Sequence, residues 1–193
     1  AVAEIKAPGL NMMYGDARGN IAWFASAQLY EKNENVHTKF ILDGSNKEET
    51  EKHYLDFEKN PQAINPSWHY VYSANNQPEE VNGKLYPGYY LPEDRAKRIV
   101  ELIKSNDAFT GEQVESMIND VQSSVSPSLV KIILDNISKV NLSETEKKAM
   151  EILKSWNGDF KKEMVAPTIY YKFIYLLLEN TFVDEMVKER FEQ

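Results

Sequence analysis

The sequence contains no cysteine in 193 residues. This absence excludes disulfide bonds, thiolate nucleophiles and cysteine-ligated metal sites. Chains without cysteine are found in the cytoplasm and in the periplasm alike, so this composition indicates no particular compartment.

Several motifs that carry chemistry are also missing. The sequence has no glycine-rich phosphate loop and no Gly-x-Ser-x-Gly nucleophile elbow. Its three histidines are His37, His53 and His69, and none has a second histidine at the spacing of a common helix-borne metal site. We therefore expect no metal, no cofactor and no self-contained catalytic set in this chain.

Positive charge is scarce, with 22 Lys+Arg against 30 Asp+Glu and a net charge of −8. Without a basic patch, a nucleic-acid partner is not expected. The longest apolar run, residues 169–178, is interrupted by Lys172 and is too short to cross a membrane. Hydrophobic residues make up 42% of the chain, which is enough for a core and argues against general disorder.

The first half of the chain predicts β-structure. Residues 11–27 form a hairpin pattern, because two apolar segments flank a turn at Gly19-Asn20 that tolerates positive φ. The returning strand is apolar at nearly every position, which is typical of a strand covered on both faces. A further short strand is expected at residues 70–72, followed by a polar turn.

The second half predicts five helices. Their starts are marked by proline or by capping residues at Pro92, Thr110, Pro127, Ser143 and Pro167.

The ends of three of these helices, and the start of the chain, can also be predicted. We expect the first helix to end near Lys104 and the fourth to end near residues 156–158, where Gly158 can adopt a left-handed cap. The fifth helix runs toward Arg190 and is apolar on most sides, so its natural partner is expected outside this chain. Residues 1–8 resemble the last turn of a helix, which indicates a chain cut from a larger protein.

The stretch Ser-Ala-Asn-Asn-Gln-Pro at residues 73–78 is the main candidate for a functional site. It carries two adjacent amide side chains, Asn75 and Asn76, in a loop position where sites are often built. An amide NH2 is a neutral hydrogen-bond donor, which suits an oxyanion hole. The alternative is a plain turn, because asparagine and proline are common turn formers.

Six motifs occur in an order and spacing that resemble one family. Residues 14–23 resemble the pattern Y-A-D-x-x-G-N-I-G-Y, and residues 65–78 resemble N-P…A-N-N-x-P. Four shorter motifs lie at residues 8–11, 94–99, 117–123 and 153–158. Together they span nearly the whole chain and resemble the β subunit of penicillin acylases (penicillin amidases), which are N-terminal-nucleophile hydrolases.

The resemblance implies an α+β fold. The chain would be an internal fragment of the αββα sandwich, with a β-hairpin and one further strand followed by about five helices. Residues 1–91 would hold the hairpin, a long loop and the oxyanion strand, and residues 92–193 would form the helical region. Together they would make one partial domain of a larger enzyme.

The resemblance also implies roles for individual residues. In this family an N-terminal serine attacks, its own α-amino group acts as the base, and an asparagine side chain helps to bind the oxyanion. Asn75 matches that asparagine, and Asn76 would support the turn. Arg95 matches the active-site arginine, which would orient the site and interact with the substrate or with Asn75. The chain begins with Ala1, so we expect the nucleophile on another segment; Ser45, in a polar turn, is not expected to serve.

The parent enzyme implied by the resemblance cleaves the side-chain amide of a small acylated substrate, such as a β-lactam antibiotic or an acyl-homoserine lactone. It would be periplasmic or secreted, and this chain alone would be inactive. Its partners would be the α subunit and the rest of the β chain. Many family members bind a structural Ca2+, but the corresponding residues 82–90 contain no acid.

A non-enzymatic α+β interaction domain is the alternative function. In that case Asn75 is only a turn residue, and the apolar surface of the last helix binds a partner.

Overall fold

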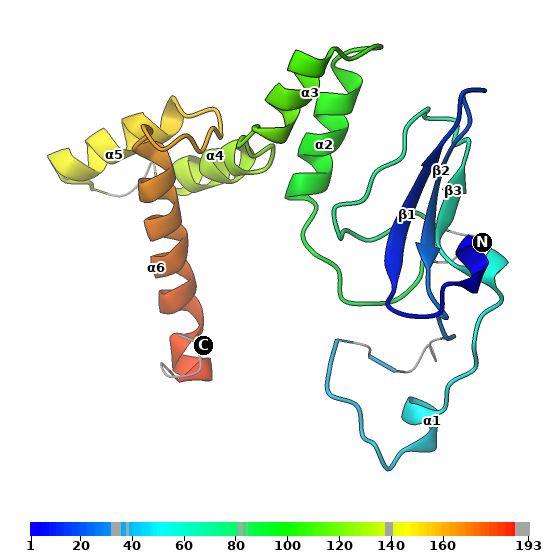
Figure 1. Cartoon of the computed structure of the whole chain (residues 1–193). Coiled ribbons are helices and arrows are strands. Elements are labelled where there is room, and N and C mark those ends of the chain that lie inside the picture. The colour runs from blue at the N-terminus through cyan, green and yellow to red at the C-terminus, as the bar shows by residue number, and fades with distance from the viewer. Residues whose placement is uncertain (32–35, 38, 81–82, 84, 138–140, 188–193) are drawn as a thin grey trace. The chain divides into compact units, whose positions relative to one another are not determined.

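The structure is a computed structural model that describes residues 1–31, 36–37, 39–80, 83, 85–137 and 141–187 (Figure 1). The chain forms two compact units, residues 1–105 and residues 106–193. The predicted division at residue 91, between a hairpin region and a helical region, stays a prediction.

The first unit contains a three-stranded sheet made of β1 (Leu10–Gly15), β2 (Ile21–Ser26) and β3 (Gln62–Ile64) (Figure 1). The strand order is β1-β2-β3 and both pairs are antiparallel, so β2 is the central strand. Ala22 and Trp23 point to opposite faces of β2, and they are only 3% and 8% exposed. Both faces of β2 are therefore covered, as its nearly continuous apolar sequence predicts.

The turn between β1 and β2 confirms the predicted hairpin. Gly19 adopts a φ of 85°, which favours glycine. The Asp16 carboxylate accepts hydrogen bonds from the backbone nitrogens of Arg18 and Asn20, each at 2.9 Å. Hydrogen bonds from Asn20 lower the pKa of Asp16, so the carboxylate stays charged in the turn.

The third strand does not lie where the sequence pattern predicts it. Residues 70–72, which the structure describes, belong to no strand. Residues 62–64 take the edge of β2 instead, with Ile64 opposite Ala22. The chain then leaves the sheet through Asn65 and His69, which have φ values of 44° and 63°.

Three short helices and one longer helix complete the first unit. They are η1 (Val2–Glu4), α1 (Lys47–Thr50), η2 (Phe57–Lys59) and α2 (Asp94–Lys104). The helical end expected at the start of the chain is the single 3-10 turn η1. Helix α2 ends at Lys104, as predicted, and the Lys104 ammonium lies 5.6 Å from the centre of the Tyr70 ring. This cation–π contact holds the end of α2 against the segment that follows the sheet.

The second unit is helical. It contains α3 (Gly111–Ile118), α4 (Ser126–Ile137), α5 (Glu144–Lys154) and α6 (Ala166–Met186) (Figure 1). Thr110 and Ser143 form the capping boxes that the sequence predicts at the starts of α3 and α5. Together with α2 of the first unit, these make five helices after residue 92 within the described residues, as predicted. Residues 188–193, into which the predicted fifth helix runs, lie outside the described part.

The core of the second unit lies where α4, α5 and α6 meet. Its buried members are Val130, Leu153, Trp156, Ala166 and Tyr170. The Trp156 indole nitrogen donates to the Asp159 carbonyl at 2.7 Å, so the polar edge of this buried ring is satisfied. Of the helices in the described residues, none is both long and apolar enough to cross a membrane.

Candidate active site

The candidate site lies in a bend at residues 74–76, between the sheet and α2. Asn75 is exposed and has a φ of 60°, in the left-handed region that asparagine tolerates better than most residues. Its backbone carbonyl accepts a hydrogen bond from Leu91 N at 2.8 Å. The expected position at the end of a strand is therefore wrong, because Asn75 lies in a hydrogen-bonded bend of an irregular segment.

Arg95, in the first turn of α2, holds the Asn75 side chain. Its Nη2 donates to the Ala74 carbonyl at 2.6 Å and to Asn75 Oδ1 at 2.8 Å. A guanidinium carries only donors, so the amide atom that faces it must be the oxygen. Nδ2 therefore points away from Arg95, and no described residue accepts a hydrogen bond from it.

The same contact makes Asn75 a stronger donor. Positive charge beside Oδ1 draws electron density through the conjugated amide toward the oxygen. The hydrogens on Nδ2 become more positive as a result, and hydrogen bonds in such a chain strengthen one another. The pair formed by Asn75 and Arg95 thus offers a polarised N–H group of fixed direction to any acceptor that approaches it.

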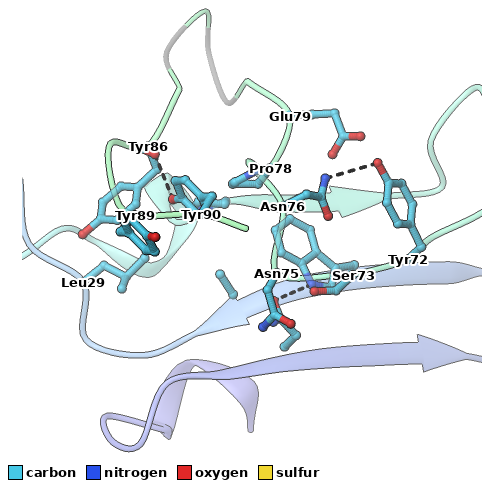
Figure 2. A pocket seen from close by; sticks show the side chains of 14 residues that line it. Leu29, Tyr72, Ser73, Asn75, Asn76, Pro78, Glu79, Tyr86, Tyr89 and Tyr90 are labelled. Carbon is cyan, nitrogen blue, oxygen red and sulfur yellow. Dashed lines mark hydrogen bonds between the residues drawn. The ribbon is translucent and has the colours of Figure 1, made fainter. Parts of the chain in front are cut away.

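Asn76, the neighbouring amide, is bound within the protein. Its Oδ1 accepts from Ala74 N at 3.2 Å, and its Nδ2 donates to the Gln77 carbonyl at 3.1 Å. Nδ2 also lies 3.4 Å from the Tyr72 hydroxyl (Figure 2). The two adjacent asparagines therefore differ: Asn75 has an unused donor, whereas the polar atoms of Asn76 have partners.

A cavity of about 290 Å3 opens beside Asn75 (Figure 2). One face of the sheet supplies Asn11, Trp23 and Ala25, and the Trp23 indole nitrogen donates to Asn11 Oδ1 at 2.9 Å. The other lining residues come from the irregular segments of the first unit: Leu29, Pro61, Tyr72, Ser73, Asn75, Asn76, Pro78, Glu79, Tyr86, Tyr89 and Tyr90. The lining is thus rich in apolar and aromatic groups, as is usual for small-molecule sites.

Tyr86, Tyr89 and Tyr90 lie together along one part of the cavity (Figure 2). The Tyr86 hydroxyl donates to the Tyr30 carbonyl at 3.1 Å, and the Tyr90 hydroxyl donates to the Tyr86 carbonyl at 2.9 Å. Burial raises the pKa of Tyr86 to about 12 and also raises the pKa of Tyr90. Both phenols are therefore neutral at physiological pH.

Glu79 is the charged member of the cavity lining. Burial, together with the nearby charge of Glu79, raises the pKa of Tyr72, so this phenol also keeps its proton. The cavity thus combines neutral phenols and one carboxylate with the polarised amide of Asn75.

The structure brings Asn75 and Arg95 into contact, although they are twenty residues apart in sequence. Their catalytic roles stay predictions. The sequence does not predict the cavity wall formed by Tyr86, Tyr89 and Tyr90. Nor does it predict the hydrogen bond from Gln77 Nε2 to the Tyr86 carbonyl at 3.0 Å. The tyrosine-rich run at residues 86–90, just before α2, was the signal that could have drawn attention to this wall.

The structure describes no cluster of three or more His, Cys, Asp or Glu side chains that could hold a metal ion. Two residues of the segment considered for Ca2+, Asn82 and Lys84, lie outside the described part of the chain.

Comparison with known proteins bears on the fold and on the family. A family model described as "Penicillin amidase" matches residues 1–193. A solved structure of a thermostable penicillin G acylase from Alcaligenes faecalis matches with a TM-score of 0.69 at 17% sequence identity. The match covers 99% of this chain and 36% of the acylase chain, so this chain spans about a third of that protein's length. The predicted α+β fold, resembling part of a penicillin acylase, is confirmed.

Proposed function

Because the chain belongs to the penicillin amidase family, we propose that it forms part of an amidohydrolase. Its substrate is a small acylated molecule, a β-lactam antibiotic or an acyl-homoserine lactone, and the bond cleaved is the side-chain amide. The observation that carries the proposal is the side chain of Asn75, a residue that lines the cavity: its oxygen is held by Arg95, which leaves Nδ2 as a donor.

The reaction begins with a serine at the N-terminus of a mature chain, on a segment outside these 193 residues. The serine oxygen bonds to the substrate carbonyl carbon, an electron pair moves to the carbonyl oxygen, and the serine's α-amino group takes the hydroxyl proton. Collapse of the tetrahedral intermediate breaks the C–N bond, and that proton passes to the departing amine. Water then hydrolyses the acyl ester.

Asn75 acts where negative charge develops in this sequence. Its Nδ2 donates to the oxyanion, and a preorganised donor at such a position contributes on the order of 3–4 kcal/mol in comparable enzymes. Arg95 holds the donor in place before substrate arrives. No reorientation of the amide is then needed as the transition state forms.

The proposed partners are the remaining segments of the same precursor, namely the α subunit and the rest of the β chain. The apolar side chains of α6 support this assignment, because many of them are exposed in the chain by itself. Those more than one third exposed are Tyr171, Tyr175, Leu176, Leu177, Leu178, Phe182 and Met186. A helix with so many apolar side chains normally lies inside a larger fold. We place the parent enzyme in the periplasm or outside the cell, on the grounds of its family.

Replacement of Asn75 in the mature full-length enzyme tests the proposal. Asn75→Ala should lower kcat about 100- to 1,000-fold and leave KM within about threefold, because the lost hydrogen bond forms only in the transition state. Asn136→Ala is the matched control, since among the described residues that exposed amide bonds only to the Ile132 carbonyl of its own helix. Unchanged kcat in Asn75→Ala would refute the role and favour the interaction-domain alternative.

A further inference from the structure

The backbone of Asn75 adopts a conformation that its neighbours must maintain. A left-handed φ in a residue other than glycine costs roughly 1–2 kcal/mol, and it persists where surrounding contacts determine it. Leu91 N and Arg95 supply three of these contacts: to the Asn75 carbonyl, to its Oδ1 and to the Ala74 carbonyl of the preceding peptide unit. None of these contacts reaches Ala74 N or the Gln77 carbonyl, the backbone groups on either side of the bend.

Asn76 binds both of these backbone groups. Its Oδ1 binds Ala74 N, before Asn75, and its Nδ2 binds the Gln77 carbonyl, after it. One side chain therefore links the backbone on both sides of Asn75. Rotation of the peptide unit that carries Ala74 N, or of the one that carries the Gln77 carbonyl, would break one of these hydrogen bonds. Asn76 therefore acts together with Arg95 and Leu91 to restrain the direction of the Asn75 side chain.

The link continues into the cavity wall. Asn76 Nδ2 lies 3.4 Å from the Tyr72 hydroxyl, and Gln77 Nε2 donates to the Tyr86 carbonyl at 3.0 Å. Tyr86 is in turn anchored through its hydroxyl to the Tyr30 carbonyl. The bend is thus joined to a half-buried part of the first unit rather than left as an independent loop.

From this arrangement we propose that Asn76 is a positioning residue, which helps to fix the direction of the Asn75 N–H donor. The proposal rests on the proposed function of Asn75. Asn76 itself does not contact the reacting atoms, because its Oδ1 and its Nδ2 are both occupied by protein groups. Its effect on catalysis passes entirely through Asn75.

A double-mutant cycle in the mature full-length enzyme separates this role from a general structural one. Asn76→Ala should lower kcat about tenfold with KM within about twofold, because misdirection of a donor affects the transition state. In an Asn75→Ala background, the same substitution should lower kcat by less than about twofold, because the Asn75 donor that Asn76 positions is already absent.

Asn76→Asp provides the conservative variant. It keeps an oxygen for Ala74 N but loses the donor to the Gln77 carbonyl, so its kcat should lie between those of the wild type and Asn76→Ala. If Asn76→Ala does not yield folded mature enzyme, the cycle is run with Asn76→Asp. The urea midpoint of each variant is measured alongside, so that kcat is compared among folded proteins.

Each outcome of the cycle has one interpretation. Loss of kcat in the Asn75 background equal to the loss in the wild-type background overturns the proposal, as does unchanged kcat in Asn76→Ala. If Asn75→Ala itself leaves kcat unchanged, the proposed function fails, and that result is seen before any Asn76 variant is measured. A tenfold loss that disappears in the Asn75→Ala background supports the positioning role.

Discussion

On the proposed function, a neutral donor at the position of Asn75 has an advantage over a charged one. A lysine or arginine there would bind the carboxylate product about as well as the oxyanion, and the product would therefore leave the site more slowly. The amide of Asn75 instead gains strength from Arg95 at its far end, while the positive charge stays one residue removed from the substrate. The same pair thus supplies polarisation without direct ion pairing.

Arg95 can be tested separately from Asn75. Arg95→Ala should lower kcat about 10- to 100-fold, because the amide loses both its fixed direction and its polarising charge. Lys97→Ala is the charge-matched control, since Lys97 lies on the same helix but pairs with Glu93 at 3.3 Å. Steady-state kinetics on the mature enzyme measure both variants. Equal effects of the two substitutions would show that only the net charge of α2 matters.

Among the secondary-structure elements, those with strong local signals are the ones that the sequence predicts correctly. The Gly19 turn, the Thr110 and Ser143 capping boxes and the Pro127 helix start all act within a few residues. Strand β3 depends instead on pairing with β2, some forty residues earlier, and its three residues carry little pattern of their own. Long-range pairing of this kind overrides the apolar pattern at residues 70–72.

In the candidate site, too, some features can be predicted from the sequence, whereas others depend on long-range contacts. Asn75 and Arg95 are predicted through motif resemblance, which needs no knowledge of their contact. The tyrosine-rich run at residues 86–90 draws attention to this segment, but its place at the cavity could not be predicted, because Tyr86 and Tyr90 are held there by hydrogen bonds to backbone carbonyls. Such contacts depend on the path of an irregular segment, for which composition gives no rule.

Gly158 offers a test at the level of a single element. Its φ is 86°, and a Cβ there would collide with the Ser123 carbonyl oxygen and lie 3.0 Å from Pro127 Cδ. Gly158→Ala should therefore lower the free energy of unfolding by about 3 kcal/mol or more, through strain and backbone displacement.

Gly19→Ala is the matched control for Gly158→Ala. Gly19 has a nearly identical φ of 85°, but a Cβ there meets no atom within 4 Å. Its replacement should lower the free energy of unfolding by only about 1 kcal/mol, from the conformation alone. Urea unfolding of both variants gives the comparison. Equal losses would mean that the clash of the added Cβ with the Ser123 carbonyl oxygen does not lower the stability of the second unit.

For the molecule as a whole, the 193 residues hold a polarised donor and a cavity wall but, on the proposed function, no nucleophile. The chain by itself should therefore give no turnover of a chromogenic phenylacetyl amide, whereas the mature parent enzyme should cleave it. The assay needs only the absorbance of the released amine at equal protein concentrations. Turnover by the 193-residue chain would show that the nucleophile lies within it.

The most direct test of the oxyanion role is the acylation rate of Asn75→Asp in the mature enzyme, measured in a single turnover. Aspartate has nearly the shape of asparagine and keeps one oxygen for Arg95, but it places a second oxygen where the donor stood. Because that oxygen repels the developing oxyanion, acylation should slow by at least as much as in Asn75→Ala, about 1,000-fold, with substrate binding little changed. A rate within about tenfold of the wild type would contradict the assignment of Asn75 as the oxyanion donor.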